Sequence, residues 1–151
     1  MDKLDVEILW TLKQSTPYAL RIPDLIKNNK KLTINDELKE KLRFLEEHEM
    51  IETLDNSDDD DVGYTIKKKG SDLIWNGEIS EQIFNLIKLV DPEMYTSNEI
   101  RRITNKSLME SVRGIEYLRK ERKLIDGYSQ GFKLYFILSE KGKSYNDETN
   151  S

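Results

Sequence analysis

Basic side chains gather in the second half of the chain at positions that suit contact with phosphate. Residues 99–123 contain 8 Lys and Arg but only 4 Asp and Glu, although the whole chain of 151 residues has a net charge of −5. Lys and Arg neutralise DNA phosphates, and Arg also reads the edge of guanine, for which Arg113 is the candidate. The residues expected to contact double-stranded DNA are Lys106, Arg113, Tyr117 and Lys120, with Arg101, Arg102 and Lys133 assisting.

The first half has the opposite charge balance. Residues 1–75 hold 12 basic and 17 acidic side chains, whereas residues 76–151 hold 12 of each. Five of the acids lie close together, at Asp55 and Asp58–Asp61, and would repel phosphate. Three interpretations of this segment stay open: a solvated loop, an acidic surface for a basic protein partner, and a divalent-ion site. The partner-binding candidates are Asp58, Asp59, Asp60 and Asp61.

The residues that catalysis usually needs are missing. The chain has no Cys, which excludes disulfides, thiolate catalysis and Cys-ligated zinc, and its one His is His48. There is no phosphate-binding glycine loop, serine-hydrolase elbow or zinc-protease motif. The Asp55–Asp61 segment also lacks the Gly and the later Glu of an EF-hand loop. We therefore expect no enzymatic activity, no cofactor and no bound metal.

The sequence carries no signal for a membrane or for secretion. The longest uninterrupted apolar run covers residues 134–138, which is far too short to span a bilayer. The N-terminal segment, MDKLDVEIL, is acidic and unlike a signal peptide. We expect a cytoplasmic protein that does not insert into membranes.

An internal repeat divides the chain into two similar halves. Ile8, Leu9 and Leu12 precede Ile83, Phe84 and Ile87 by 75 residues, and Leu20 precedes Tyr95 by the same offset. The pairs Phe44-Leu45 and Met50-Ile51 recur as Tyr117-Leu118 and Leu124-Ile125, and Tyr64-x5-Gly70 recurs as Phe136-x5-Gly142. The repeat predicts an acidic domain over residues 1–75 and a second domain over 76–151, ending in a polar tail at 146–151. Trp10 is a candidate contact for a homodimer if its side chain is exposed.

Each half has the same predicted order of elements. Apolar spacing indicates helices at 4–14 and 80–90, each followed by a short helix, at 23–28 and at about 97–103. The third helices have caps at Thr33-x-x-Asp36 and Ser107-x-x-Glu110. Their predicted inward residues are Ile34, Leu38, Leu42 and Leu45 in the first half, and Leu108, Val112, Ile115 and Leu118 in the second. Two strands follow in each half, and in the second half residues 126–131 are predicted to form the turn between them.

Three helices followed by a hairpin resemble the winged-helix variant of the helix-turn-helix. FLEEHEMIE and YLRKERKLID resemble the end of a recognition helix that leads into the first wing strand, and YTIKKKG and FILSEKG resemble the returning strand. The expected fold is α+β and mostly helical, with two tandem winged-helix domains, each of three helices and a β-hairpin wing. The resemblance extends to small prokaryotic and archaeal DNA-binding regulators, and it implies that the third helix enters the major groove beside the wing.

Two functions are compatible with this resemblance. The first is a non-catalytic transcriptional regulator that binds duplex DNA through the third helix and wing of the second domain. The alternative is a protein-interaction scaffold, because tandem winged-helix chains of this size also resemble subunits of chromosome-condensing complexes, of the ESCRT-II complex and of RNA polymerases. The acidic first domain favours a protein partner, and the basic third helix of the second domain favours DNA.

Overall fold

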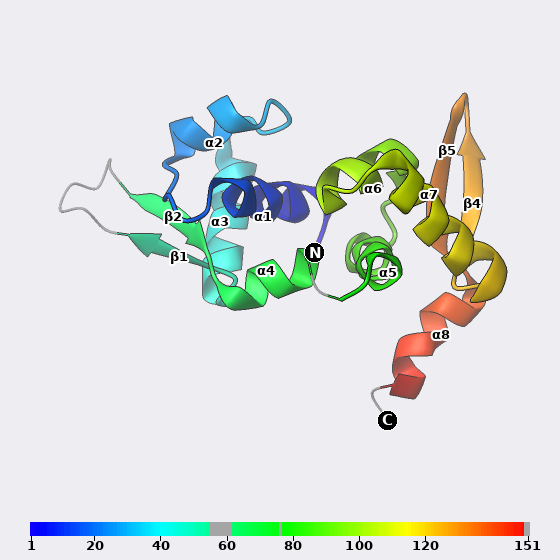
Figure 1. Ribbon diagram of the computed structural model, residues 1–151. Coiled ribbons are helices and arrows are strands. Elements are labelled where there is room, and N and C mark those ends of the chain that lie inside the picture. Colours follow the sequence, from blue (N-terminus) through cyan, green and yellow to red (C-terminus); the bar gives the residue numbers. More distant parts are fainter. Residues whose placement is uncertain (55–61, 76, 150–151) are drawn as a thin grey trace. The chain divides into compact units, whose positions relative to one another are not determined.

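The computed structural model describes residues 1–54, 62–75 and 77–149, which form an α+β protein with more residues in helices than in strands. The predicted α+β, mostly helical class is confirmed. The chain divides into two compact units, Lys3–Ile74 and Trp75–Ser151 (Figure 1). None of the described helices has the length and apolar character needed to cross a bilayer.

Unit 1 contains α1 (Lys3–Ser15), α2 (Ile22–Asn28) and α3 (Asp36–Glu47), then strands β1 (Ile51–Leu54) and β2 (Gly63–Ile66), then α4 (Lys68–Ile74). Leu38, Leu42 and Leu45 of α3 are buried as predicted. Two other expectations for α3 are wrong. Its cap is Asn35, whose side chain accepts a hydrogen bond from the backbone N–H of Leu38, and Ile34 lies outside the helix and is 53% exposed. Trp10 is half-buried.

Unit 2 contains α5 (Ile79–Val90), β3 (Tyr95–Thr96), α6 (Ser97–Thr104) and α7 (Leu108–Glu116). The chain continues through a π-helical turn, η2 (Tyr117–Glu121), into β4 (Ile125–Gln130), β5 (Lys133–Leu138) and α8 (Glu140–Thr149). The three strands form one antiparallel sheet in the order β3-β5-β4. The predicted cap of α7 is confirmed, because the Ser107 hydroxyl accepts a hydrogen bond from the backbone N–H of Glu110. At the start of α6, Thr96 forms a capping box with Glu99.

Residues matched by the sequence repeat occupy matching places in the two units. Leu20 forms a bridge with Tyr64 in unit 1, and Tyr95 pairs with Phe136 in unit 2. Both pairs join the segment before the second helix of the unit, α2 or α6, to the returning strand. The 75-residue and 72-residue offsets therefore connect positions that make the same backbone contact.

The start of the first hairpin strand is also built in the same way twice. The second residue before the strand has positive φ in both units, 60° at Glu49 and 57° at Lys123. The next carbonyl, of Met50 or of Leu124, accepts a hydrogen bond from the chain that leaves the hairpin. A Cβ added at Gly70 or at Gly142 would collide with that same carbonyl. The recurring Gly is therefore required by close approach of the fourth helix to the backbone.

Three features differ from the predicted layout. A fourth helix follows each hairpin, α4 in unit 1 and α8 in unit 2, where the sequence indicated only a turn. Residues 146–149, placed in the polar tail, belong to α8. The predicted turn over residues 126–131 is wrong, because β4 runs to Gln130, which pairs with Lys133. Only Gly131 and Phe132 connect the strands, and Gly131 has the positive φ, 64°, that tight two-residue turns need at their first position.

Candidate nucleic-acid interface

The buried face of α7 is made mainly of small residues. Ser111, Gly114 and Ile115 are buried, and Leu118 of η2 continues this face. A Cβ on Gly114 would lie 2.8 Å from Cδ1 of Ile83 on α5, so the absence of a side chain permits the close packing of α5 and α7. The predicted inward positions of Leu108 and Val112 are wrong: their side chains are 52% and 44% exposed.

The opposite face of α7 mixes cations, a carboxylate and apolar side chains. Arg113 is exposed as predicted, and Met109 is 64% exposed. Lys120 in η2 is also exposed, but its Nζ lies 2.7 Å from a carboxylate oxygen of Glu116. Sequence reasoning missed Glu116, although its spacing of four residues from Lys120 is the usual signal of a helical ion pair. Glu116 removes part of the positive charge that the candidate interface was expected to have.

The neighbours of Glu116 lower the pKa of its carboxyl group. A hydrogen bond from Lys120 is the largest cause that lowers the pKa of the Glu116 carboxyl; desolvation, the next largest, opposes it, and the charges of Lys120 and Arg119 lower the pKa further. Arg119 contributes weakly, with Nη1 at 3.9 Å from the carboxylate. Lys120 therefore keeps an anionic neighbour at neutral pH.

Tyr117 is held by a network at the end of the helix. Its side chain is 44% exposed, and its hydroxyl faces the guanidinium of Arg122. Hydrogen bonding to the hydroxyls of Tyr145 and Tyr117 raises the pKa of Arg122, and its Cζ lies 5.1 Å from the centre of the Tyr145 ring. Arg122 thus interacts with both Tyr117 of η2 and Tyr145 of α8, and Tyr117 stays partly exposed to solvent.

The β4–β5 hairpin contacts η2, the turn that continues α7 (Figure 1). A methyl group placed on Gly127 would sit 3.7 Å from Cζ of Arg119, so the Arg119 side chain packs against β4. Lys133 is exposed at the outer end of β5, next to the turn. The structure thus brings Arg113, Lys120 and Lys133 onto α7, η2 and the adjoining hairpin of one unit.

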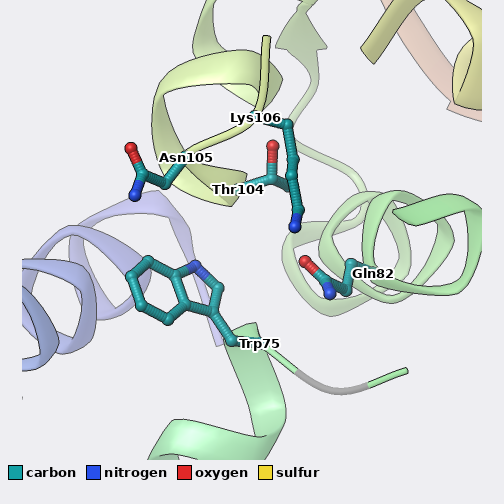
Figure 2. A pocket seen from close by; sticks show the side chains of 5 residues that line it. All are labelled: Trp75, Gln82, Thr104, Asn105 and Lys106. Carbon is teal, nitrogen blue, oxygen red and sulfur yellow. The ribbon is translucent and has the colours of Figure 1, made fainter. Parts of the chain in front are cut away.

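Lys106 lies apart from the exposed face of α7. It precedes the cap residue Ser107 and is half-buried in the turn between α6 and α7. Figure 2 shows its ammonium group directed toward Gln82, in a pocket of about 170 Å³ that is lined by Trp75, Gln82, Thr104, Asn105 and Lys106. The prediction that Lys106 shares a helix face with Arg113 is wrong, because the helix begins only at Leu108.

Arg101 and Arg102 lie on α6. Ile100 and Ile103 form the buried side of this short helix, which leaves Arg101 exposed and Arg102 half-buried. The pocket beside α6 is small for an organic ligand, and the Trp75 indole N–H at its edge is already bonded to the carbonyl of Ile103 at 2.7 Å. We assign no ligand to it.

The acidic candidates Asp58, Asp59, Asp60 and Asp61 lie outside the described residues. Across residues 1–54, 62–75 and 77–149, no three His, Asp or Glu side chains are grouped closely enough to hold a metal ion.

Comparison with known proteins does not assign the chain to a family. No protein-family model matches it, and a search of curated proteins finds no match. The features that bear on function are therefore the exposed cations of α7, η2 and the hairpin, and the apolar side chains that lie among them.

Proposed function

We propose that the protein is a non-catalytic, tandem winged-helix DNA-binding regulator, and that unit 2 binds duplex DNA. In this proposal α7 enters the major groove, and the β4–β5 hairpin is a wing that lies along the neighbouring phosphate backbone. Arg113 reads a base edge and also neutralises phosphate charge in the groove, Lys133 contacts a phosphate, and Lys120 reaches a phosphate only when it leaves Glu116. Arg101 on α6 contacts the backbone at the side of the groove.

One observation carries the proposal. Exposed cations lie on α7, on η2 and on the hairpin of unit 2, and η2 both continues α7 and contacts β4 within one compact unit. A duplex needs this combination, because groove contacts specify sequence while phosphate contacts set the position of the protein. The exposed apolar residues of α7 are compatible with it, since apolar side chains in the major groove contact the methyl group of thymine.

The test is a fluorescence-anisotropy titration of the full chain into a 30-base-pair duplex at about 50 to 200 mM salt. The variant Arg113→Ala with Lys120→Ala should weaken binding at 0.1 M salt by at least about 8-fold, the contribution of one phosphate contact. The control is Lys88→Ala with Lys141→Ala, which removes the same charge from exposed positions on α5 and α8. Equal effects of the two double changes would exclude the α7 face as the DNA contact.

A protein-interaction function is the second candidate, and a specific observation favours it. Leu108, Met109 and Val112 are all at least 44% exposed at the N-terminal end of α7. Clustered apolar side chains on a surface are typical of a protein-binding site. On this reading α7 contacts a partner protein or a second copy of the chain, and its cations serve only solubility.

The substitution Met109→Gln with Val112→Gln separates the two functions. Under the DNA proposal the variant keeps the salt dependence of duplex binding, because no charge is changed. A homodimer through α7 would show twice the 17.8 kDa of one chain in light scattering, and the variant would return it to one chain mass. A monomer at all concentrations would exclude self-association through this surface.

A further inference from the structure

The most exposed large apolar side chain among the described residues is Phe132, with a relative exposure of 110%. It is the second residue of the two-residue turn between β4 and β5. The turn follows six-residue strands that are paired along their whole length, from Ile125 opposite Leu138 to Gln130 opposite Lys133. Phe132 is therefore an aromatic ring held in water at the end of a fully paired hairpin.

The hairpin reaches far enough to act at a distance from α7. Five steps along a strand, at a rise of about 3.3 Å each, place the turn about 17 Å from the base of the hairpin. Half a turn of B-DNA is also about 17 Å long, since a full turn measures about 34 Å. A hairpin that follows the backbone beside the major groove can thus bring its tip to the adjacent minor groove.

The charge near the tip favours an anionic partner such as a nucleic acid over a basic or an uncharged partner. From Gly127 to Ile137 the sequence contains no Asp or Glu, and its one charged residue is Lys133, which is exposed. Ser129 and Gln130, exposed beside the turn, add neutral hydrogen-bonding groups. The nearest acid on the strands, Asp126, lies at the base of the hairpin opposite Ile137.

Gly131 gives the tip its narrow shape. Its positive φ closes the turn with no side chain beside Phe132, and no atom lies within 4 Å of where its Cβ would be. The Phe132 ring is consequently the outermost group at the tip of the hairpin. Apolar wedges of this kind enter the minor groove, partly unstack one base step and bend the duplex.

We propose that Phe132 is a wedge residue that inserts from the minor groove into a base step of the duplex bound by unit 2. This inference rests on the proposed function and adds to it a preference for duplexes that contain a weakly stacked base step. A base step that is already weakly stacked requires less energy to open, so the protein should favour duplexes with a local defect. Lys133 holds the neighbouring phosphate while the ring stacks on the exposed base.

The experiment compares two short duplexes of one sequence, one fully paired and one with a single central mismatch next to 2-aminopurine, whose fluorescence rises on unstacking. The full chain should bind the mismatched duplex about tenfold more tightly, which is within the effect of one stacked aromatic. Binding should also raise the 2-aminopurine fluorescence. Phe132→Ala should lose both effects yet keep its affinity for the paired duplex within about twofold, since no phosphate contact changes.

Two further variants make the test specific to a stacking ring. Phe132→Trp should retain the preference, because it keeps an aromatic side chain at the tip. Tyr128→Ala removes a 46% exposed ring from the face of the same hairpin, away from the turn, and should also retain the preference.

The possible failures are distinguishable. If the wild-type chain binds neither duplex, the proposed function and the wedge fall together. If it binds the paired duplex with the expected salt dependence but shows no preference, or if Phe132→Ala keeps the preference, the wedge alone is refuted. Phe132 would then be assigned to a protein contact.

Discussion

The ion pair between Glu116 and Lys120 provides the sharpest test of the proposed contact between α7 and DNA. The carboxylate lies on the helix face that carries Arg113, and its oxygen is 2.7 Å from Nζ of Lys120. Replacing Glu116 with Gln keeps the shape of the side chain and removes its charge. Lys120 then becomes available to a phosphate, and an anion disappears from the surface that faces the polyanion.

The magnitude follows from counting exposed cations. Arg101, Arg113 and Lys133 give three phosphate contacts, so log K should fall with log salt at a slope of about −2.7. Affinity then falls about 40-fold between 50 and 200 mM salt. Freeing Lys120 adds a fourth contact, which changes the slope to about −3.6 and the loss to about 150-fold. At 0.1 M salt the variant should bind about 8-fold more tightly than the wild type.

The assay is the anisotropy titration across salt concentrations, with Glu140→Gln as the matched control. Glu140 is exposed at the start of α8, so its removal alters net charge equally without freeing Lys120. The control should gain much less affinity and keep the slope of the wild type. If both variants behave alike, only net charge matters and the α7 face is not at the DNA. Weaker binding by Glu116→Gln would refute the reasoning outright.

Two further predictions concern the stability of the fold. Gly142→Ala should lower the free energy of unfolding by about 1–3 kcal/mol in urea denaturation, because the added methyl group collides with the carbonyl of Leu124; an unchanged midpoint contradicts that contact. A hydrogen bond from the backbone N–H of Arg21 is the main cause of the lowered pKa of the Asp24 carboxyl. An NMR titration should therefore place this pKa below the ordinary value of 3.8. Asp24 therefore stabilises the protein above the pKa of the unfolded chain, and the destabilisation by Asp24→Asn should shrink as the pH falls below about 4.

The repeat predicted more of the fold than the apolar pattern of any one segment. The repeat matched Leu20 with Tyr95 and Tyr64 with Phe136, and the structure shows that within each unit these residues are backbone partners about 40 residues apart, a pairing that the repeat itself did not predict. The residues that form this backbone bridge recur in the repeat because both units need the same bridge. The fourth helices were missed because Gly70 and Gly142 are typical of turns. Their role in helix packing depends on a carbonyl that is distant in sequence.

The candidate site was harder to predict, because small residues can form the buried face of a helix. The sequence pattern favoured Leu108 and Val112 as inward residues, since apolarity was the only signal used. The structure buries Ser111 and Gly114 instead, where α5 approaches too closely for a larger side chain. The signal that could have identified them is their spacing, because each lies four residues before a buried apolar residue, Ile115 or Leu118.

The third helices of the two units carry opposite charges on equivalent faces. This difference explains why one unit suffices for the proposed function. Aligning the buried Leu45 of α3 with Leu118 brings Glu40 to the position of Arg113 and Glu47 to that of Lys120. Both acids are exposed on α3, so in unit 1 the surface equivalent to the α7 face repels phosphate. Under the proposed function, this reversal of charge restricts DNA contact to unit 2. A basic protein partner for the acidic unit 1 stays a prediction from the charge balance of the two halves.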